Sequence, residues 1–226
     1  MYSGEYVPPT LTIDSVVFQW SAEQGLSVLL IQRSYEPFMG AWALPGGYCA
    51  AGETTRDAMS RVLSAKGGID TDRLGLVEQL YTFDTVARDP RGHAVSVTYT
   101  GLGRDLKPAP GDTTQNPTFW PLQKLPDLAY DHADILAYAL QRLRSKLSYT
   151  NVVYALMPPL FTLSQLQSCY EAIAGRSLDK RNFRKKILAS GFLKETEKMH
   201  ATGAHRPARL YEFQQQTLQT SDHIYS

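Results

Sequence analysis

Two carboxylates and the start of a helix follow a glycine-containing loop, an arrangement that can bind a cation or a phosphate group. The carboxylates are Glu53 and Asp57. Hydrolysis of a pyrophosphate needs a divalent cation held by several oxygen ligands. Val62, Ala65 and Lys66 are three and four residues apart, so a helix places them on one face. None of the three supplies a carboxylate, so the sequence predicts no metal and no hydrolysis at this site.

A second cluster of charge lies between Leu178 and Leu188, where five Lys and Arg residues accompany apolar ones. Phe183, Ile187 and Leu188 fall on one face of the predicted helix, and the basic residues fall on the others. In the DNA major groove, Arg and Asn reach base edges and Lys neutralises phosphate. The pattern predicts a DNA-binding helix. A helical hairpin with a solvated basic face is the alternative.

The net charge of +1 conceals an asymmetry between the two parts of the chain. Residues 1–149 contain 13 Lys and Arg against 16 Asp and Glu, whereas residues 150–213 contain 10 against 5. A slightly acidic body thus carries a basic module. The module either binds an anionic partner or presents a basic face to solvent. The apolar share of 43% and the charged share of 20% are typical of a soluble globular protein.

Targeting and redox features favour the cytoplasm. The first residues lack the basic and then apolar order of a secretory signal, and no apolar run reaches the length of a membrane span. The two cysteines, Cys49 and Cys169, show no paired spacing, which argues against a disulfide framework and against a thiolate metal site. We expect a cytoplasmic protein with no membrane contact and no cofactor.

The first 149 residues alternate strands and helices in an order that gives a mixed sheet covered by helices. The predicted strands are Leu11 to Trp20, Leu26 to Arg33, Leu74 to Phe83, Ala94 to Gly103 and a short one from Phe119. The predicted loops are Tyr35 to Gly52 and Asp105 to Pro117. Thr54 and Asp57 form the capping box of a helix that stops at Gly67 and Gly68, and a second helix spans Asp131 to Leu147.

A domain boundary is predicted at Tyr149, where the charge balance changes sign. The elements expected after it are helices Thr162 to Ala174 and Leu178 to Ser190, and strands Phe192 to Lys198 and Arg209 to Phe213. This order indicates a winged helix-turn-helix of three helices and a two-stranded wing. Residues 214–226 are polar and are expected to form a flexible tail. The fold class is therefore α+β, with domains 1–149 and 150–213.

The segment from Gly47 to Ile69 resembles the Nudix box, G-x5-E-x7-R-E-U-x-E-E-x-G-U, in which U is a bulky aliphatic residue. The residues in register are Gly47, Glu53, Arg61, Leu63, Gly68 and Ile69. Val62, Ala65 and Lys66 occupy the places of the glutamates that bind metal in Nudix hydrolases. The resemblance implies a Nudix fold for the first domain and the loss of hydrolase activity.

Nearly the whole chain, from about Leu11 to Phe213, resembles the Nudix-related transcriptional regulators of the NrtR family. The stretches that carry the resemblance are Asp179 to Lys186, Arg206 to Tyr211, Tyr81 to Asp84, Arg88 to Gly92 and Asp131 to Ile135. The family consists of bacterial repressors of NAD synthesis and salvage genes. The resemblance implies that the inactive pocket binds ADP-ribose or a related NAD metabolite, and that binding releases the protein from operator DNA.

The resemblance implies a ligand pocket, and residues of types that suit a nucleotide are expected to line it. The expected ligand-binding residues are Arg33, Phe38, Trp42, Gly46, Gly47, Phe83, Arg91 and His93. An arginine at a strand end pairs with phosphate, and an aromatic ring stacks on adenine. For two of these residues a structural role is open, because Arg33 could cap the sheet edge and Trp42 could pack in the core.

The residues expected at DNA are Lys180, Arg181, Asn182, Arg184 and Lys185 on the recognition helix, and His205, Arg206 and Arg209 on the wing. An arginine on a wing follows phosphate or enters the minor groove. We expect a homodimer that binds a palindromic double-stranded operator, with the ligand changing the spacing of the two winged helices.

Three other functions fit parts of this pattern. An active Nudix hydrolase, such as an ADP-ribose pyrophosphatase, would need catalytic groups from another loop. A regulator of the same architecture could sense a pentose such as arabinose. The basic C-terminal module could bind a partner other than DNA.

Overall fold

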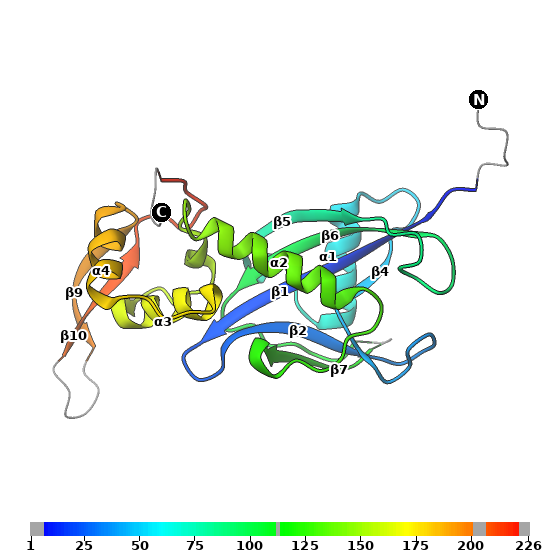
Figure 1. Ribbon diagram of the computed structural model, residues 1–226, viewed down its shortest axis with the longest axis horizontal. Helices are drawn as coiled ribbons and strands as arrows, with labels where there is room; N and C mark the ends of the chain where they lie inside the picture. Colours follow the sequence, from blue (N-terminus) through cyan, green and yellow to red (C-terminus); the bar gives the residue numbers. More distant parts are fainter. Residues whose placement is uncertain (1–6, 112–113, 201–206, 222–226) are drawn as a thin grey trace.

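The computed structural model describes residues 7–111, 114–200 and 207–221. Two bodies lie side by side along the long axis of the molecule (Figure 1). The larger body is built on a seven-stranded sheet and the smaller one on helices and a three-stranded sheet. This is the α+β class that the sequence predicts.

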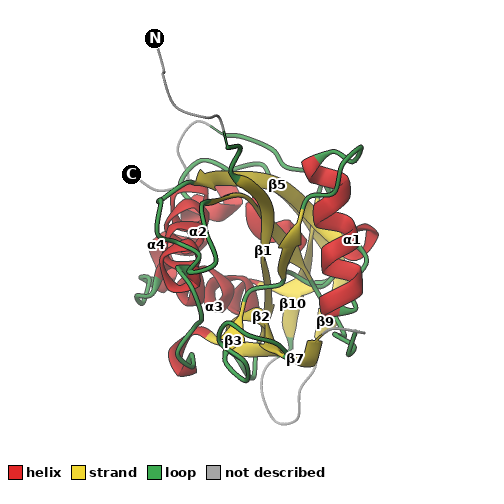
Figure 2. Cartoon of the chain, turned by 90° about the vertical axis from the view of Figure 1, so that its right-hand side faces the viewer, coloured by secondary structure: helices red, strands yellow, loops and turns green. Residues whose placement is uncertain are grey.

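The large sheet is mixed, because β1 pairs in parallel with β6 and antiparallel with β2 and β4. Its strands are β1 (Thr10–Ser21), β2 (Gly25–Arg33), β3 (Trp42–Ala43), β4 (Gly46–Tyr48), β5 (Leu74–Phe83), β6 (Ala94–Gly103) and β7 (Thr114–Pro121). Helix α1 (Thr55–Gly67) covers one face of the sheet and α2 (His132–Lys146) the other (Figure 2). The central strands are therefore largely buried on both faces.

The boundaries of α1 follow from local chemistry. The Thr54 side chain accepts a hydrogen bond from the Asp57 amide, and the Asp57 carboxylate accepts one from the Thr54 amide, which confirms the predicted capping box. Gly68 ends the helix with φ +65°, and a Cβ there would lie 2.5 Å from the backbone nitrogen of Ala109. Only glycine fits this conformation and this contact, which holds the end of the helix against the loop between β6 and β7.

The smaller body has the elements of a winged helix. They are β8 (Phe161–Thr162), α3 (Leu163–Ala174), α4 (Lys180–Ala189), β9 (Leu193–His200) and β10 (Ala208–Phe213). Two expectations need correction. The element before α3 is a 3-10 turn, η3 (Val152–Ala155), in place of an α-helix, and β8 adds a third strand to the wing in the order β8-β10-β9.

The two bodies share one hydrophobic core. Leu143 of α2 and Leu147 at its C-cap belong to the same buried cluster as Leu166 and Ile173 of α3. At the same junction, the Arg144 guanidinium donates a hydrogen bond of 2.8 Å from Nε to the carbonyl oxygen of Ile173. The winged helix is thus packed against the end of α2 and is not joined to the larger body by a linker alone.

Three further segments differ from the predicted boundaries. β7 begins at Thr114, five residues before Phe119, and β3 and β4 lie inside the predicted loop from Tyr35 to Gly52. Residues 217–221 do not form a flexible tail, because the buried Asn151 accepts from the Gln219 amide and donates to the Thr217 carbonyl. The remaining short helices are η1 (Thr71–Arg73) and η2 (Leu122–Lys124). None of the helices in the described ranges is long and apolar enough to cross a membrane.

Candidate functional site

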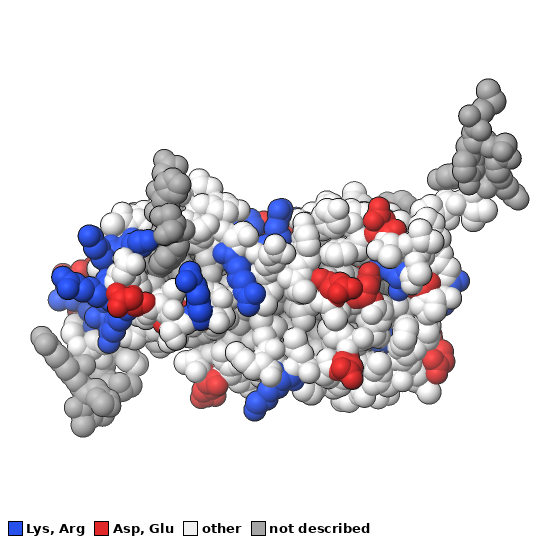
Figure 3. All heavy atoms as spheres, in the orientation of Figure 1, with Lys and Arg blue, Asp and Glu red and all other residues white. Residues whose placement is uncertain are grey.

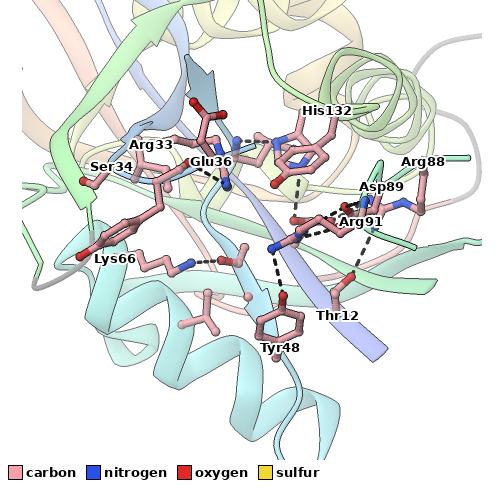
Figure 4. Close-up of a pocket in the computed structure, with 18 of the residues that line it drawn as sticks. Thr12, Arg33, Ser34, Glu36, Tyr48, Lys66, Arg88, Asp89, Arg91 and His132 are labelled. Atoms are coloured by element: carbon pink, nitrogen blue, oxygen red, sulfur yellow. Dashed lines mark hydrogen bonds and ion pairs between the residues drawn. The ribbon is translucent and has the colours of Figure 1, made fainter. Parts of the chain in front are cut away.

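A cavity of about 470 Å³ opens beside the N-terminus of α2, within the size range of small-molecule sites. Its walls come from β1, β4, α1, the loop after β2 and the connection between β5 and β6 (Figure 4). The charged side chains that line it are Asp14, Arg33, Glu36, Arg61, Lys66, Arg88, Asp89 and Arg91, accompanied by His132. The elements of one domain therefore bring together cations that are distant in the sequence.

A buried network forms the floor of the cavity. Asp14 accepts hydrogen bonds from Arg88 Nη2 at 3.1 Å and from Ser96 Oγ at 2.7 Å. Arg88 also binds Asp131 through two nitrogens, at 2.8 and 2.9 Å. His132 Nδ1 accepts from the Leu44 amide, which leaves the Nε2 proton directed at Asp14, 3.4 Å away. Burial alone would raise the pKa of Asp14, but His132, Arg88 and Ser96 outweigh it and lower the pKa to about 2.

Gly46 is required by the closeness of this floor. A Cβ at Gly46 would lie 2.1 Å from Asp14 Oδ1, so no other residue fits without displacing the carboxylate. Gly47 tolerates slightly more, because its Cβ would lie 3.0 Å from Val62 Cγ2. The two glycines bring the backbone of β4 against the buried network and against α1.

The rim of the cavity combines arginines with tyrosine rings. The Arg33 guanidinium lies 4.9 Å from the ring centroid of Tyr130, and that of Arg91 lies 5.7 Å from the ring of Tyr48. Arg91 also forms an ion pair with Asp89, which raises the pKa of Arg91. The Tyr130 hydroxyl is buried and has no hydrogen-bond partner among the described residues. A ligand that supplies an acceptor there would satisfy it.

Glu53 in the loop before α1 and Arg61 on α1 are box residues of opposite charge that bind each other. Arg61 donates to both carboxylate oxygens of Glu53, at 3.0 and 2.5 Å, and the Ala50 amide also donates to Glu53. Arg61 holds the pKa of Glu53 below its usual range. A further hydrogen bond runs from Arg61 to the carbonyl of Tyr48. This pair stabilises the loop after β4.

The cavity contains four of the eight residues predicted to bind ligand: Arg33, Gly46, Gly47 and Arg91. The other four do not line it. Trp42 packs edge-on against Trp120 at 5.1 Å, and Phe83 packs against Tyr81 and Tyr138. Phe38 is 42% exposed and packs against the ring of Tyr130, which lines the cavity. His93 is exposed, and its carbonyl accepts from the Thr10 amide.

The second candidate surface is α4 of the winged helix. Lys and Arg side chains gather over this end of the molecule (Figure 3). Asp179 caps the helix by accepting from the Asn182 amide, while Phe183 and Ile187 are buried beneath it. The predicted contact residues Lys180, Arg181, Asn182 and Lys185 are exposed, and Arg184 is half-buried. Leu188 corrects the predicted apolar face, because it is 48% exposed.

On the wing, Arg209 is exposed and forms an ion pair with Glu195 of the neighbouring strand. The predicted contact residues His205 and Arg206 lie outside the described residues. The described part of the wing therefore presents one of the three predicted DNA contacts, and its charge is balanced within the protein.

Known protein families match both the domain that contains the cavity and the domain that contains α4. A NUDIX domain model matches residues 11–142, and a model described as NrtR DNA-binding winged helix domain matches residues 153–213. The ADPR responsive transcriptional repressor NtrR of Acinetobacter baylyi is 40% identical over 218 residues, which cover 93% of this chain and 84% of that one. The chain belongs to the NrtR family.

Two solved structures of NrtR from Shewanella oneidensis are similar to this protein. One is of NrtR complexed with a 27mer DNA, with 32% identity, a TM-score of 0.74 and coverage of 90% of this chain and 93% of that one. The other is of its NUDIX domain complexed with ADP ribose, with 34% identity, a TM-score of 0.56 and coverage of 61% and 90%. The NrtR fold therefore extends over both bodies.

The Nudix half of an NrtR protein raises the question of a divalent metal. In this chain the donors do not fit one, because Val62 and Lys66 line the cavity where the Nudix box places glutamates, and Ala65 is exposed. Glu53 is bound by Arg61. Among the described residues no group of three or more His, Cys, Asp and Glu side chains could hold a metal ion. No carboxylate cage of the kind that Mg²⁺ requires is present there.

Sequence reasoning missed the floor of the NrtR cavity. Asp14 gave a signal, because it is a carboxylate inside a run of apolar strand residues. Asp131 and His132 gave another, since they lie in a stretch that carries the family resemblance. Tyr130 gave none, because only the long-range packing of its loop brings its ring beside Arg33.

Proposed function

We propose that this NrtR-family protein is a transcriptional repressor whose winged helix binds operator DNA and whose Nudix cavity binds ADP-ribose or a closely related NAD metabolite without hydrolysing it. The main support is the composition of the cavity. The α1 residues on its wall are Arg61, Val62 and Lys66, and further cations come from Arg33 and Arg91. Such a cavity attracts a diphosphate but offers no carboxylate ligands on α1 for the metal that cleavage requires.

The regulatory setting follows the family. We propose that the protein acts in the cytoplasm as a homodimer on a palindromic double-stranded operator, and that it controls NAD synthesis and salvage genes. Release from the operator on ligand binding is part of the same proposal. A monomer at micromolar concentration, with and without operator DNA, in analytical ultracentrifugation would contradict the dimer.

Helix α2 is the element best placed to couple the two sites. Its first turn carries His132, which contributes to the floor of the cavity, and Asp131 just before it binds Arg88. Its last turns carry Leu143 and Arg144, which contact the winged helix. A ligand that shifts the first turn of α2 therefore moves a helix whose other end packs against α3. A shift between two conformational states requires contacts that differ between those states.

The DNA-binding role is tested by the double substitution Arg181→Ala/Arg184→Ala. We expect at least a tenfold loss of operator affinity, because arginines that reach bases or phosphates each contribute about 1–3 kcal/mol. Arg56→Ala/Lys124→Ala removes two exposed cations from the larger body and serves as the matched control. Equal operator affinity of the first variant and the wild type in fluorescence anisotropy would exclude α4 as the recognition helix.

The loss of hydrolysis is tested by incubation with ADP-ribose and Mg²⁺. Release of AMP at a rate in the enzymatic range of about 1–10³ per second would favour the active pyrophosphatase instead. A thermal-shift panel of ADP-ribose, NAD and pentoses separates the NAD-metabolite sensor from a sugar sensor. Stabilisation by arabinose alone would exclude our proposal.

A further inference from the structure

Lys66 occupies a defined position on the wall of the cavity. Its Nζ donates a hydrogen bond of 2.5 Å to the carbonyl oxygen of Gly46 (Figure 4). The ammonium group lies beside Gly47, where a Cβ would be in ordinary van der Waals contact with Nζ at 3.7 Å. The sequence alone suggests that Lys66 merely replaces a metal-binding carboxylate and repels cations. The structure places a cation of the chain against a carbonyl oxygen at the cavity surface.

The neighbouring charges make this position favourable for an anion. Burial lowers the pKa of Lys66, and the positive charge of Arg33 lowers it further. Arg33 itself donates to the carbonyl oxygens of Pro37 and Tyr35. Arg91, by comparison, is paired with the carboxylate of Asp89. An anion bound between Lys66 and Arg33 would relieve the repulsion between these two cations.

Three oxygen donors in or beside the cavity are already used within the protein. The Gly46 carbonyl accepts from Lys66, Glu53 is bound by Arg61, and Asp14 is bound by Arg88. A divalent cation would have to displace the Lys66 ammonium from the Gly46 carbonyl. It would also be repelled by the positive charges of Lys66 and Arg33. The cavity thus does not fit a metal ion for a structural reason, which is that the Lys66 amino group occupies the space next to Gly46.

We propose that Lys66, together with Arg33, forms a metal-free subsite for the phosphate groups of a diphosphate ligand. The ammonium group supplies at Gly46 the positive charge that a metal ion supplies in a Nudix hydrolase. The inference rests on the proposed function for the identity of the whole ligand, but the subsite itself requires only a diphosphate. Ligand binding is consequently independent of divalent metal.

The experiment is isothermal titration calorimetry of the full chain with two probes, inorganic pyrophosphate and ADP-ribose, in buffer with EDTA. Lys66→Gln removes the charge and Lys66→Glu reverses it, while Lys124→Gln is the matched control on an exposed lysine. We expect the wild type and Lys124→Gln to bind pyrophosphate equally. We expect a loss of about 10- to 100-fold for Lys66→Gln, because a charge-assisted hydrogen bond is removed, and a larger loss for Lys66→Glu.

The outcomes separate the subsite from the function. Pyrophosphate binding by Lys66→Gln within twofold of the wild type, or wild-type binding that appears only after Mg²⁺ is added, would overturn the subsite, as would no pyrophosphate binding at all. Pyrophosphate binding that depends on Lys66, without any binding of ADP-ribose, would uphold the subsite and refute the proposed effector. Melting temperatures equal to that of the wild type verify that each variant is folded.

Discussion

The Nudix cavity and the recognition helix α4 both present several cations, yet they hold them in opposite ways. In the cavity, Arg88 and Arg61 are fixed by carboxylates, and Arg88 is almost fully buried. On α4, Arg181 and Lys185 are exposed, and the buried Phe183 and Ile187 anchor the helix from below. Interlocked charges give a site one defined shape, whereas exposed charges give a surface that adapts to a polyanion.

This difference between paired and exposed charges shows what each region contributes to a regulator. Substitutions in the cavity change stability and ligand binding together, because a buried charge that loses its partner is costly. Substitutions on the outer face of α4 change DNA affinity and leave stability intact. The two regions are connected through α2, so the ligand effect on DNA is a third quantity that can be lost separately.

Of the substitutions that test this difference between the two regions, Arg88→Met is expected to have the largest effect. The change leaves the buried Asp14 without its guanidinium partner, so we expect the free energy of unfolding to fall by about 3–5 kcal/mol. Arg91→Met is the matched control, because its ion pair with Asp89 is part-exposed and contributes about 1 kcal/mol or less. Urea denaturation measures both, and equal losses would show that the floor network does not differ from a surface ion pair.

A second prediction concerns pH. The pKa of Asp14 is lowered from 3.8 to about 2, so its contribution is fully present above pH 4 and is lost as the pH falls towards 2. The contribution is about 2 kcal/mol. Asp14→Asn should remove this acid-dependent part of the stability, whereas Asp134→Asn, on the exposed side of α2, should retain it. Urea denaturation from pH 2 to pH 7 distinguishes the two slopes.

A smaller effect tests the connection between the regions. Arg144→Ala removes the hydrogen bond to the Ile173 carbonyl at the junction with α3. We expect ADP-ribose affinity and operator affinity to remain near the wild-type values, while the change in operator affinity caused by ADP-ribose shrinks by about 0.5–2 kcal/mol. Anisotropy titrations with and without ligand provide all three numbers. An undiminished ligand effect would remove α2 from the coupling route.

The smallest effect is expected from Lys185→Ala on α4. An exposed lysine contacts phosphate without reading sequence, so operator affinity should fall by less than tenfold. The slope of log affinity against log salt should decrease in magnitude by about 1. An unchanged slope would place Lys185 outside the DNA interface.

Local sequence signals predicted the elements of the fold well. β5 and β6 have the predicted boundaries, and the capping box of α1 is present. β7 was predicted too short, because the Pro, Gly and Thr residues from Asp105 to Pro117 favour a loop and Pro117 lacks an amide proton. The pairs Gln32 with Gln115 and Arg33 with Thr114 extend the strand through long-range pairing.

The candidate site was predicted less completely, for a physical reason. Arg33, Gly46 and Gly47 follow from local patterns at a strand end and in a glycine loop. Tyr130 follows from none, because its position depends on the hydrogen bond from the Ala129 amide to the Trp42 carbonyl. Trp42 itself had two open roles in the sequence, and the structure places it against Trp120. Contacts between distant segments decide which aromatic ring faces the cavity.

The most direct test of the whole account measures DNA release and ligand integrity in one sample. The wild-type protein is bound to labelled operator DNA, ADP-ribose is added with Mg²⁺ and, in parallel, with EDTA, and the ligand is recovered for chromatography. We predict that ADP-ribose releases the DNA to the same extent in both buffers and is recovered intact. Release that occurs only with Mg²⁺ and together with formation of AMP, or no release at all, would contradict the conversion of a Nudix enzyme into a sensor.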